Sequence, residues 1–357
     1  MNFKKLATLT LSTAIATTVA FADHYSTARP DSHAPIMVMG DHAHDKGEWM
    51  VSVRQMRMEM DGMRSGTDSV SSDEVFASNY TVTPTRMTMD MTMLGFMHAP
   101  SEKVTFMIMA PYIETEMDHL IFGMAAPLIN LNGGTREFTT KSSGFGDVKI
   151  SALLPFWESD KQKAHYGIGL SLPTGSIGEQ DLIPGPGGRI PRQMPAPMQL
   201  GSGTIDLLPS VTFLGQEEKW SYGAQASARI RTGENHHDYR LGHQFAATSW
   251  IATTPNDSTS ISLRANYQYT GEISGTQSDL SLNPPFAPSR RTVTTAFSEN
   301  YGGQKFELGA GINLYPKEGV LAGHRFALEF TMPVWQDLNG FQLETDYTTT
   351  IGWQKAW

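Results

Sequence analysis

The stretch from Asp257 to Thr270, DSTSISLRANYQYT, decides the fold class of this chain. From Ser260 onward its side chains alternate between polar and apolar. The apolar face carries Ile261, Leu263, Ala265, Tyr267 and Tyr269, and the polar face carries Ser260, Ser262, Arg264, Asn266 and Gln268. A period of two residues is that of a β-strand with unlike faces. Such a strand suits a membrane β-barrel, where apolar side chains meet lipid and polar ones line the lumen.

Twelve segments of strand length, this one included, follow one another along the chain, and short connections mostly alternate with long ones. They are residues 48–60, 84–98, 103–116, 143–156, 164–173, 204–215, 219–232, 242–254, 257–271, 303–315, 323–333 and 343–356. This pattern predicts an all-β fold, a transmembrane antiparallel β-barrel of about 12 strands with short periplasmic turns and long extracellular loops. A soluble β-sandwich is the rival fold, but tryptophan and tyrosine near strand ends are typical of membrane interfaces.

The composition bounds the possible partners. Residues 1–22 have the features of a Sec-type signal peptide, because Lys4 and Lys5 precede a weakly apolar run that ends in Ala20-Phe21-Ala22. Its removal lowers Lys plus Arg from 27 to 25 against 36 acids, so the net charge changes from −9 to −11. That charge argues against nucleic acid as a partner. The absence of cysteine excludes disulfides and thiolate metal ligands.

We therefore expect three parts: the signal peptide over residues 1–22, a periplasmic segment containing His and Asp over residues 23–47, and an outer-membrane barrel over residues 48–357. Short turns face the periplasm in such barrels, which predicts that both chain ends lie there. The partners of such a protein are outer-membrane lipid and a small solute or metal ion.

The last strand ends on an aromatic residue, Trp357, with Trp353 and Ile351 in the same phase. A terminal aromatic on an alternating strand resembles the address that outer-membrane assembly machinery reads, although Lys355 interrupts the pattern. The alternative is an ordinary amphipathic strand at the chain end.

Methionine is distributed unevenly. Without Met1, sixteen of the nineteen methionines lie between Met37 and Met124. The candidate metal ligands among them are Met56, Met58, Met60, Met63, Met87, Met89, Met91, Met93, Met107 and Met109. Thioethers are soft donors that suit Cu(I) or Ag(I), so we expect a Met-rich outer mouth that handles a soft metal ion. The alternative is that methionine fills apolar positions, for which its flexibility suits it.

The two interpretations make different demands on side-chain direction. On the first strand Val51 and Val53 would face lipid, which leaves the methionines from Met56 to Met60 inside. The same argument places Met107 and Met109 inside. On the second strand the polar residues Arg86, Thr88, Asp90 and Thr92 alternate with the methionines and would take the lumen instead, so packing is favoured there.

A second candidate metal site precedes the first strand. It consists of His33, His42 and His44, with Asp41 and Asp45 nearby. Imidazole and carboxylate suit Cu(II), Zn(II) or Ni(II). A solvated polar tail is the interpretation that we favour for this segment.

Charged residues of both signs are predicted to line the lumen. They are Arg54, Arg229, Arg231, Arg264, Lys305, Glu307, Arg325, Glu329 and Asp346. Such charges either set the selectivity of a pore or neutralise one another in a plugged interior. The proline-rich segment from Gly185 to Met198 either folds inward as a constriction or is an exposed, disordered loop.

No enzymatic activity is expected. The chain has no phosphate loop, no nucleophile elbow and no zinc-protease helix motif. No histidine of the predicted strands lies mid-barrel beside an outward serine, so no catalytic residue and no required cofactor are predicted; Cu(I) or Ag(I) enters only as a bound or transported ion.

Several motifs resemble a known family. They are Gly144-Phe145-Gly146-Asp147-Val148-Lys149, Leu172-Pro173-Thr174-Gly175-Ser176, the run from Met87 to Met93 and the run from Met198 to Thr204, together with Pro30 to Pro35 and Met39 to His42. They are similar to the outer-membrane family called "putative MetA-pathway of phenol degradation", which is transporter-like. The resemblance covers nearly all of the chain after the signal and implies an outer-membrane barrel without catalytic residues.

Three functions stay open at this point. The first is a channel that handles Cu(I) or Ag(I) through a Met-rich outer mouth. The second is a passive channel for small aromatic or hydrophobic compounds, and the third is a structural or adhesive outer-membrane protein without transport.

Overall fold

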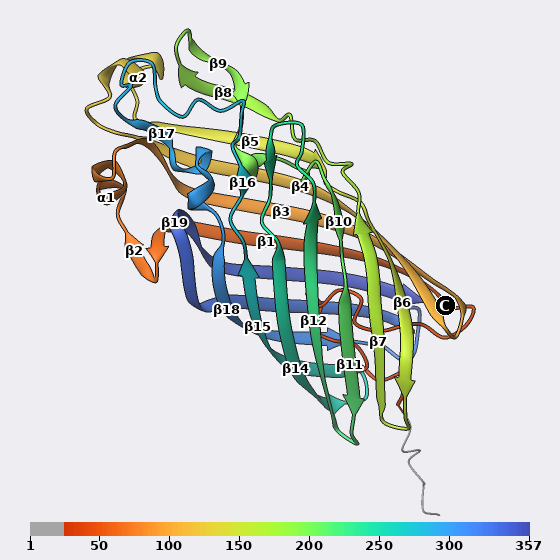
Figure 1. Cartoon of the computed structure of the whole chain (residues 1–357). Coiled ribbons are helices and arrows are strands. Elements are labelled where there is room, and N and C mark those ends of the chain that lie inside the picture. The colour runs from red at the N-terminus through yellow and green to blue at the C-terminus, as the bar shows by residue number, and fades with distance from the viewer. Residues whose placement is uncertain (1–24) are drawn as a thin grey trace, which may run out of the picture.

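The computed structural model describes residues 25–357. They form a closed, all-β barrel whose ring strands run antiparallel to their neighbours (Figure 1). One end, here the turn end, has short connections and the C-terminus, and the other, the loop end, has long loops with α1 (Ser72–Ala77) and α2 (Ala126–Leu131). The barrel predicted from the sequence is confirmed. The predicted signal peptide, residues 1–22, lies outside the described residues.

The ring is built from long strands with the following bounds: β1 (Trp49–Gly66), β3 (Tyr80–Ser101), β4 (Val104–Ile121), β5 (Glu137–Phe145) continued by β6 (Lys149–Glu158), β7 (Gln162–Ser171), β10 (Ile205–Leu207) continued by β11 (Ser210–Gln216), β12 (Trp220–Thr232), β14 (Gln244–Asn256), β15 (Thr259–Thr270), β18 (Gly303–Leu314) and β19 (His324–Ala356). Each pairs with the next along the chain, and β1 with β19 closes the ring.

β19 is one continuous element that occupies two positions in the ring. Its first part pairs with β18, from Phe326 to Leu338, and its last part pairs with β1, from Leu338 to Ala356. Between them the chain turns at Gly340, whose φ of +57° is one that glycine adopts readily. A ring of antiparallel neighbours closes only with an even number of positions, so the eleven positions above become twelve when β19 is counted twice.

Each of the twelve predicted segments overlaps one of the twelve ring positions. Several strands reach further toward the loop end than predicted: β1 ends at Gly66, β3 starts at Tyr80, β4 ends at Ile121 and β5 starts at Glu137. The predicted segments 143–156 and 204–215 are interrupted at residues 146–148 and 208–209. With 18 residues, β1 is about 60 Å long at ~3.3 Å per residue. The apolar band of an outer-membrane barrel is about 25 Å tall, so these strands project well beyond the lipid.

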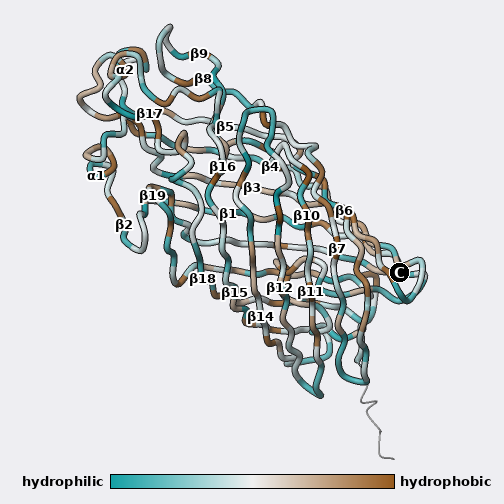
Figure 2. The backbone as a smooth tube through the Cα atoms, viewed as in Figure 1, coloured by the Kyte–Doolittle hydropathy of each residue, from teal (hydrophilic) through white to brown (hydrophobic). Residues whose placement is uncertain are grey.

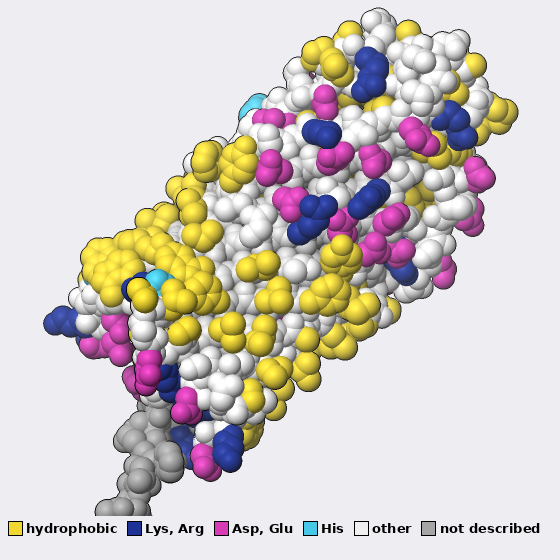
Figure 3. All heavy atoms as spheres, turned by 180° about the vertical axis from the view of Figure 1, so that it is seen from behind, with side chains coloured by type: hydrophobic (Ala, Val, Ile, Leu, Met, Phe, Trp, Pro, Cys, Tyr) yellow, Lys and Arg dark blue, Asp and Glu magenta, His cyan; other side chains and the backbone are white. Residues whose placement is uncertain are grey.

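The outer wall carries an apolar belt nearer the turn end. Along these strands hydrophobic residues alternate with hydrophilic ones (Figure 2). Leu263 is 62% exposed, whereas the next residue on the strand, Arg264, is 6% exposed. Further toward the loop end, basic and acidic side chains gather on the outer surface (Figure 3). They include the ion pairs of Arg57 with Asp90 and of Arg86 with Glu59, which lie on the projecting parts of β1 and β3.

The loop end carries the shorter elements. They are β2 (Asp68–Val70), β8 (Gln180–Gly185), β9 (Gly188–Gln193), β13 (Tyr239–Arg240), β16 (Ser274–Gly275), β17 (Arg291–Val293) and the 3-10 turns η1 (Ala196–Met198), η2 (Thr294–Ala296) and η3 (Ser298–Asn300). Among residues 25–357 no helix has the length and apolar character needed to cross a membrane.

The segment from Gly185 to Met198 divides into two parts. The β8–β9 hairpin projects from the loop end, as Figure 1 shows. The residues that follow it turn inward, and Met194 and Met198 are buried against Met87 and Met117. The last part of the segment folds inward, as the first alternative predicted. The first part is exposed, as the second alternative predicted, but it is an ordered hairpin and not a disordered loop.

Candidate functional site

Residues 25–47 lie inside the barrel at the turn end and form what we call the plug. The chain enters beside the β6–β7 turn, where the Tyr25 amide bonds to Asp160, and returns to the turn end at Gly47. Between these points Ala34 and Ile36 are 1% exposed. The predicted solvated tail is therefore wrong for this segment. The sequence did not reveal this burial, because a polar lumen can satisfy the backbone hydrogen-bonding groups of an irregular segment just as water can.

The strands around the plug supply its hydrogen bonds. Ser221 on β12 donates to Asp31 O at 2.8 Å, and Ser260 on β15 donates to Pro30 O at 2.9 Å. His165 on β7 bonds to Gly40 O at 2.9 Å. Donors on strands around the ring thus hold one segment, which explains why the inward faces carry serine, glutamine and histidine.

Charged side chains fasten the innermost part of the plug. Glu329 is completely buried and accepts hydrogen bonds from Arg264 Nε at 2.6 Å and from the Met37 amide at 2.9 Å. Arg325 donates to Ala34 O at 2.6 Å, and Arg54 bonds to the sulfur of Met39. Of the two roles predicted for inward charges, neutralisation is seen for the ion pair of Arg264 with Glu329, whereas Arg325 and Arg54 bond to uncharged groups of the plug.

Of the five remaining predicted lumen charges, Arg231, Lys305 and Glu307 have local partners. Arg231 pairs with Asp206, and Lys305 bonds to Thr345. Glu307 accepts from Asn266 at 2.8 Å, and Arg229 lines a cavity of about 260 Å³ in the lumen.

Asp346 corrects the prediction, because it is exposed on the outer surface. The register of β1 against β19 shifts between the Glu59–Tyr347 pair and the Met60–Thr345 pair. The extra residue of this bulge, Asp346, therefore loses the inward phase of its neighbours. The negative charges of Asp61 and Glu59 lie near the Asp346 carboxylate and repel it.

Methionines line the inner wall along β1, β3 and β4. In the register of β1 with β3, Met56 lies opposite Met91, Met58 opposite Met89, and Met60 opposite Met87. We call these six residues the methionine ladder. The β1 methionines face inward as predicted.

The expectation for the second strand is wrong. Met87 and Met93 are each 3% exposed, whereas Leu94 in the phase of Arg86, Thr88, Asp90 and Thr92 is 52% exposed. The polar residues are outside because this part of β3 stands beyond the lipid band, where an outward charge stays hydrated. The alternation there shows two unlike faces but not which of them is the inner one.

The methionines do not form one patch at a single mouth. Met87 packs with Met117, Met194 and Met198 at the loop end. Met107 and Met109 pack with Met50, Met93 and Met97 nearer the turn end, which corrects their predicted place at the outer mouth. Met63 belongs to a third group with Val75 and Tyr80. The ladder connects the first two groups along the wall.

An apolar pocket opens at the loop end beside the first methionine group. It has a volume of about 260 Å³ and lies between β3, β4, β5, the β8–β9 hairpin and the loop before β17. Its apolar lining includes Val82, Leu128, Phe138, Ile183, Phe286 and Val293. Sequence reasoning missed these residues, because they come from distant loops whose contacts no periodic pattern reveals.

The wall of the barrel is interrupted next to this pocket. β5 pairs with β4 on one edge, while its other edge has no strand partner, because β7 ends at Ser171 and pairs with β6 and β10 only up to there. The gap is filled by residues 146–148, 174–176 and 200–204, and we call this part of the wall the seam.

Asp147 joins the segments that fill the seam. Its carboxylate accepts hydrogen bonds from the Gly175 amide at 3.0 Å and from the amide and hydroxyl of Ser202 at 2.9 and 2.7 Å. A Cβ on Gly201 would stand 2.4 Å from Gly175 O, so these chain segments touch backbone to backbone. The three glycine-rich motifs that carry the family resemblance thus meet at one place, although the seam was not predicted from them.

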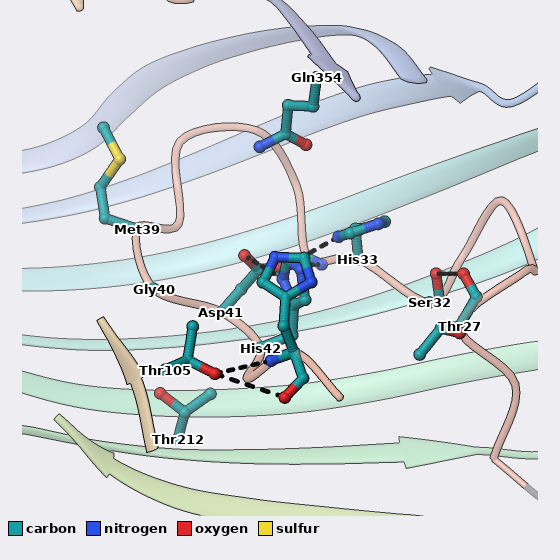
Figure 4. A network of polar contacts seen from close by, with 12 residues as sticks. Thr27, Ser32, His33, Met39, Gly40, Asp41, His42, Thr105, Thr212 and Gln354 are labelled. Atoms are coloured by element: carbon teal, nitrogen blue, oxygen red, sulfur yellow. Dashed lines mark hydrogen bonds and ion pairs between the residues drawn. The ribbon is translucent and has the colours of Figure 1, made fainter. Parts of the chain in front are cut away.

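The three candidate histidines of the plug lie together. The ring centroids of His33 and His42 are 4.3 Å apart, and those of His42 and His44 are 4.7 Å apart. Asp41 stands beside the first two (Figure 4).

Comparison with known proteins identifies the fold and the family. The structure is similar to that of the COG4313 outer membrane channel from Pseudomonas putida F1, with a TM-score of 0.56, 13% identity, and coverage of 90% of this chain and 99% of that chain. It is more distantly similar to a deltaS2 mutant of the TodX monoaromatic hydrocarbon channel, with a TM-score of 0.40, 10% identity, and coverage of 89% and 92%. The search of curated proteins found no match.

The sequence model of one family matches residues 75–345, a range that includes the seam and most of the ring. This agrees with the resemblance found in the sequence motifs and with an outer-membrane barrel fold. The chain therefore belongs to the outer-membrane β-barrel family described as "Putative MetA-pathway of phenol degradation".

Proposed function

We propose that this protein is a channel for small apolar solutes, and that single-ring aromatic compounds are the class that fits it best. The observation that carries this proposal is the apolar pocket that opens at the loop end beside a methionine-lined wall. An apolar cavity of about 150 Å³ is enough to bind benzene, so a pocket of about 260 Å³ has room for a substituted ring. Methionine suits such a wall because its thioether packs favourably against aromatic faces.

The proposed route runs from the loop end toward the seam. The plug fills the lumen at the turn end, so it obstructs a straight path along the barrel axis. The seam lies next to the pocket along β5, which contributes Phe138 and Thr140 to the pocket lining and whose Ser142 donates a hydrogen bond at 2.7 Å to Met198 O, two residues before the seam segment 200–204. An apolar solute gains free energy by entering lipid rather than water. We therefore propose that the solute leaves sideways through the seam into the membrane.

The proposal also specifies how the barrel is oriented in the membrane. We propose that the loop end lies outside the cell and both described chain ends in the periplasm, because short turns face the periplasm in outer-membrane barrels. The family description, which names phenol degradation, is consistent with an aromatic solute.

The experiment is to lock the seam. The chain has no cysteine, so a double variant Asp147→Cys, Ser202→Cys contains a single pair of thiols. The two native side chains touch at 2.7 Å, which brings the thiols near enough to form a disulfide. Cells that express the oxidised variant should take up radiolabelled toluene at the rate of cells without the barrel, and reduction should restore the wild-type rate.

Two further measurements make the result decisive. The oxidised variant should keep the heat-modifiable mobility of a folded barrel in electrophoresis. Equal toluene uptake by the oxidised and reduced forms would rule out the lateral route, and equal uptake with and without the wild-type barrel would rule out the channel.

A second candidate function, handling of Cu(I) or Ag(I), is favoured by the opposed methionines of the ladder. Replacing Met56, Met58 and Met60 with leucine keeps an apolar wall of similar volume but removes three thioethers. If the wall serves apolar solutes, toluene uptake should stay within about twofold of wild type and Cu(I) binding by the purified protein should not change. Loss of Cu(I) binding would favour the metal instead.

A further inference from the structure

The plug contains a group of side chains that the proposed channel does not use. His33, Asp41 and His42 each offer a ligand atom, and these atoms lie within 4.8 Å of one another. Figure 4 shows the group among the strands of the barrel. Asp41 is 3% exposed and His42 is 8% exposed, so the group is enclosed rather than spread over a surface.

The hydrogen bonds of this group leave ligand atoms unused. Asp41 accepts from the Ala34 amide at 3.0 Å and from His42 Nδ1 at 3.0 Å. His33 Nδ1 stands 3.6 Å from the Asp41 carboxylate, beyond hydrogen-bonding distance, and residues 25–357 offer it no other partner. His42 Nε2 is likewise buried without a partner among these residues. A buried polar atom without a partner costs free energy, which a bound ion would recover.

A third imidazole extends the group. His44 Nδ1 bonds to Glu48 at 3.1 Å, and its Nε2 is buried without a partner. An imidazole that donates one nitrogen to a carboxylate and keeps the other free is the usual state of a metal ligand. His44 lies beside His42 and also bonds Thr105 on β4 through its backbone, so the strand wall fixes its position.

We propose that His33, Asp41 and His42 bind a borderline divalent metal ion such as Zn²⁺, with His44 positioned beside it. Imidazole nitrogen with one carboxylate is a ligand set for Zn²⁺, Ni²⁺ or Cu²⁺ rather than for a soft monovalent ion. A cavity of about 220 Å³ at the turn end, lined by His33, His42, His44 and Glu48, provides the path of entry.

The bound ion acts as a latch on the plug. His33 and His42 stand at the two ends of a loop, and the middle of that loop carries Met37 and Met39, which bond to Glu329 and Arg54. An ion that needs both ends close together binds the looped form of the segment more tightly than an extended form. By linkage, the ion stabilises the looped form, which is the form docked in the barrel.

The test uses the full processed protein, refolded in detergent and stripped with a chelator. Titration with Co²⁺, followed by its visible absorption, and competition by Zn²⁺ in calorimetry should show one ion per chain. His33→Gln and His42→Gln should each weaken binding by at least about tenfold, the scale of losses at metal centres. His236→Gln, at an exposed histidine of the loop end, is the matched control and should bind as the wild type does.

Conductance in planar bilayers gives a second readout. Zn²⁺ should make openings of the wild-type barrel rarer, and this effect should vanish in His33→Gln. A variant is compared with the wild type only if its heat-modifiable mobility shows a folded barrel. One folded variant, His33→Gln or His42→Gln, is sufficient for the test. Zn²⁺ binding that both variants retain, or no binding by the wild type, would overturn the site, whereas toluene uptake tests the channel separately.

Discussion

At the scale of single residues, a buried ion pair determines how firmly the plug is held. Arg264 on β15 and Glu329 on β19 meet across β18, which lies between them. They can do so because β18 has Gly309 between them, where a Cβ would stand 2.9 Å from Glu329 Oε1. The sequence predicted that both charges are inward. It did not predict that they pair, because no periodic pattern encodes a contact across an intervening strand.

Replacing Glu329 with glutamine should loosen the plug. Removing one partner of a buried ion pair costs about 3–5 kcal/mol, because the other charge is left buried without compensation. Here the loss also weakens the acceptor of the Met37 amide. We expect more frequent channel openings in planar bilayers and faster proteolysis of residues 25–47.

The matched control for that variant is Arg57→Gln. Arg57 pairs with Asp90 on the outer surface, where their side chains are 50% and 30% exposed. A surface pair contributes only about 0–1 kcal/mol, so channel openings should not change. Equal effects of the two substitutions would contradict the role assigned to Glu329.

At the scale of elements, alternation along the strands was sufficient to locate the barrel but not to orient every strand. On β15 the outward face is apolar because it meets lipid, so the prediction for Ile261 and Leu263 holds. On β3 the same rule reversed the inner and outer faces, because Met87 and Met89 lie beyond the lipid belt. There the inner face is determined by what packs against it, namely Met194 and Met198 from a distant loop.

Shortening the β8–β9 hairpin should weaken the apolar pocket without disturbing the barrel. Replacing residues 182–191 with two glycines removes Ile183, Pro184 and Pro186 from the pocket lining but leaves Val82, Leu128 and Phe138. We expect a normally folded barrel that binds the fluorescent apolar probe N-phenylnaphthylamine at least about fivefold more weakly, since Ile183 buries apolar surface worth roughly 1.5–3 kcal/mol. A comparable deletion in the turn at residues 317–321 should leave probe binding unchanged, and a pocket that tolerates both deletions would contradict its assigned lining.

At the scale of the whole molecule, the barrel and its plug are separable. The ring closes through its own backbone hydrogen bonds, while the plug is held mainly by side chains. The sequence predicted the twelve positions of the ring but not the break in its wall at residues 146–148, and it placed the plug in water, because residues 25–47 have neither the period of a strand nor that of a helix. Only the inward polar residues of the ring, taken together, indicated that something fills the lumen.

Deleting residues 25–45 should open the turn end. Because the twelve ring positions do not need the plug to pair, the shortened protein should still insert and show heat-modifiable mobility. Planar-bilayer recordings should then show a steady conductance several times that of the complete chain. A conductance equal to that of the complete chain would mean that the plug does not obstruct the lumen.

The proposed orientation can be tested with single cysteines. Gly187→Cys lies at the tip of the β8–β9 hairpin, and Lys317→Cys lies in the turn between β18 and β19. A membrane-impermeant maleimide added to intact cells should label position 187 and leave position 317 unlabelled until the outer membrane is permeabilised. The reverse pattern would place the loop end in the periplasm.

The free edge of β5 makes the mechanical strength of the cylinder uneven. Elsewhere in the ring, separating two neighbouring strands requires breaking a continuous ladder of backbone hydrogen bonds. At the free edge of β5 the Lys141 amide instead donates to a side-chain oxygen of Asp181 at 2.7 Å. Thermal fluctuation should therefore begin at this line, and amide hydrogens there should exchange with deuterium sooner than those of β15. If the proposed sideways route is used, a wall that is weaker along one line opens there while the hydrogen bonds of the remaining circumference stay intact.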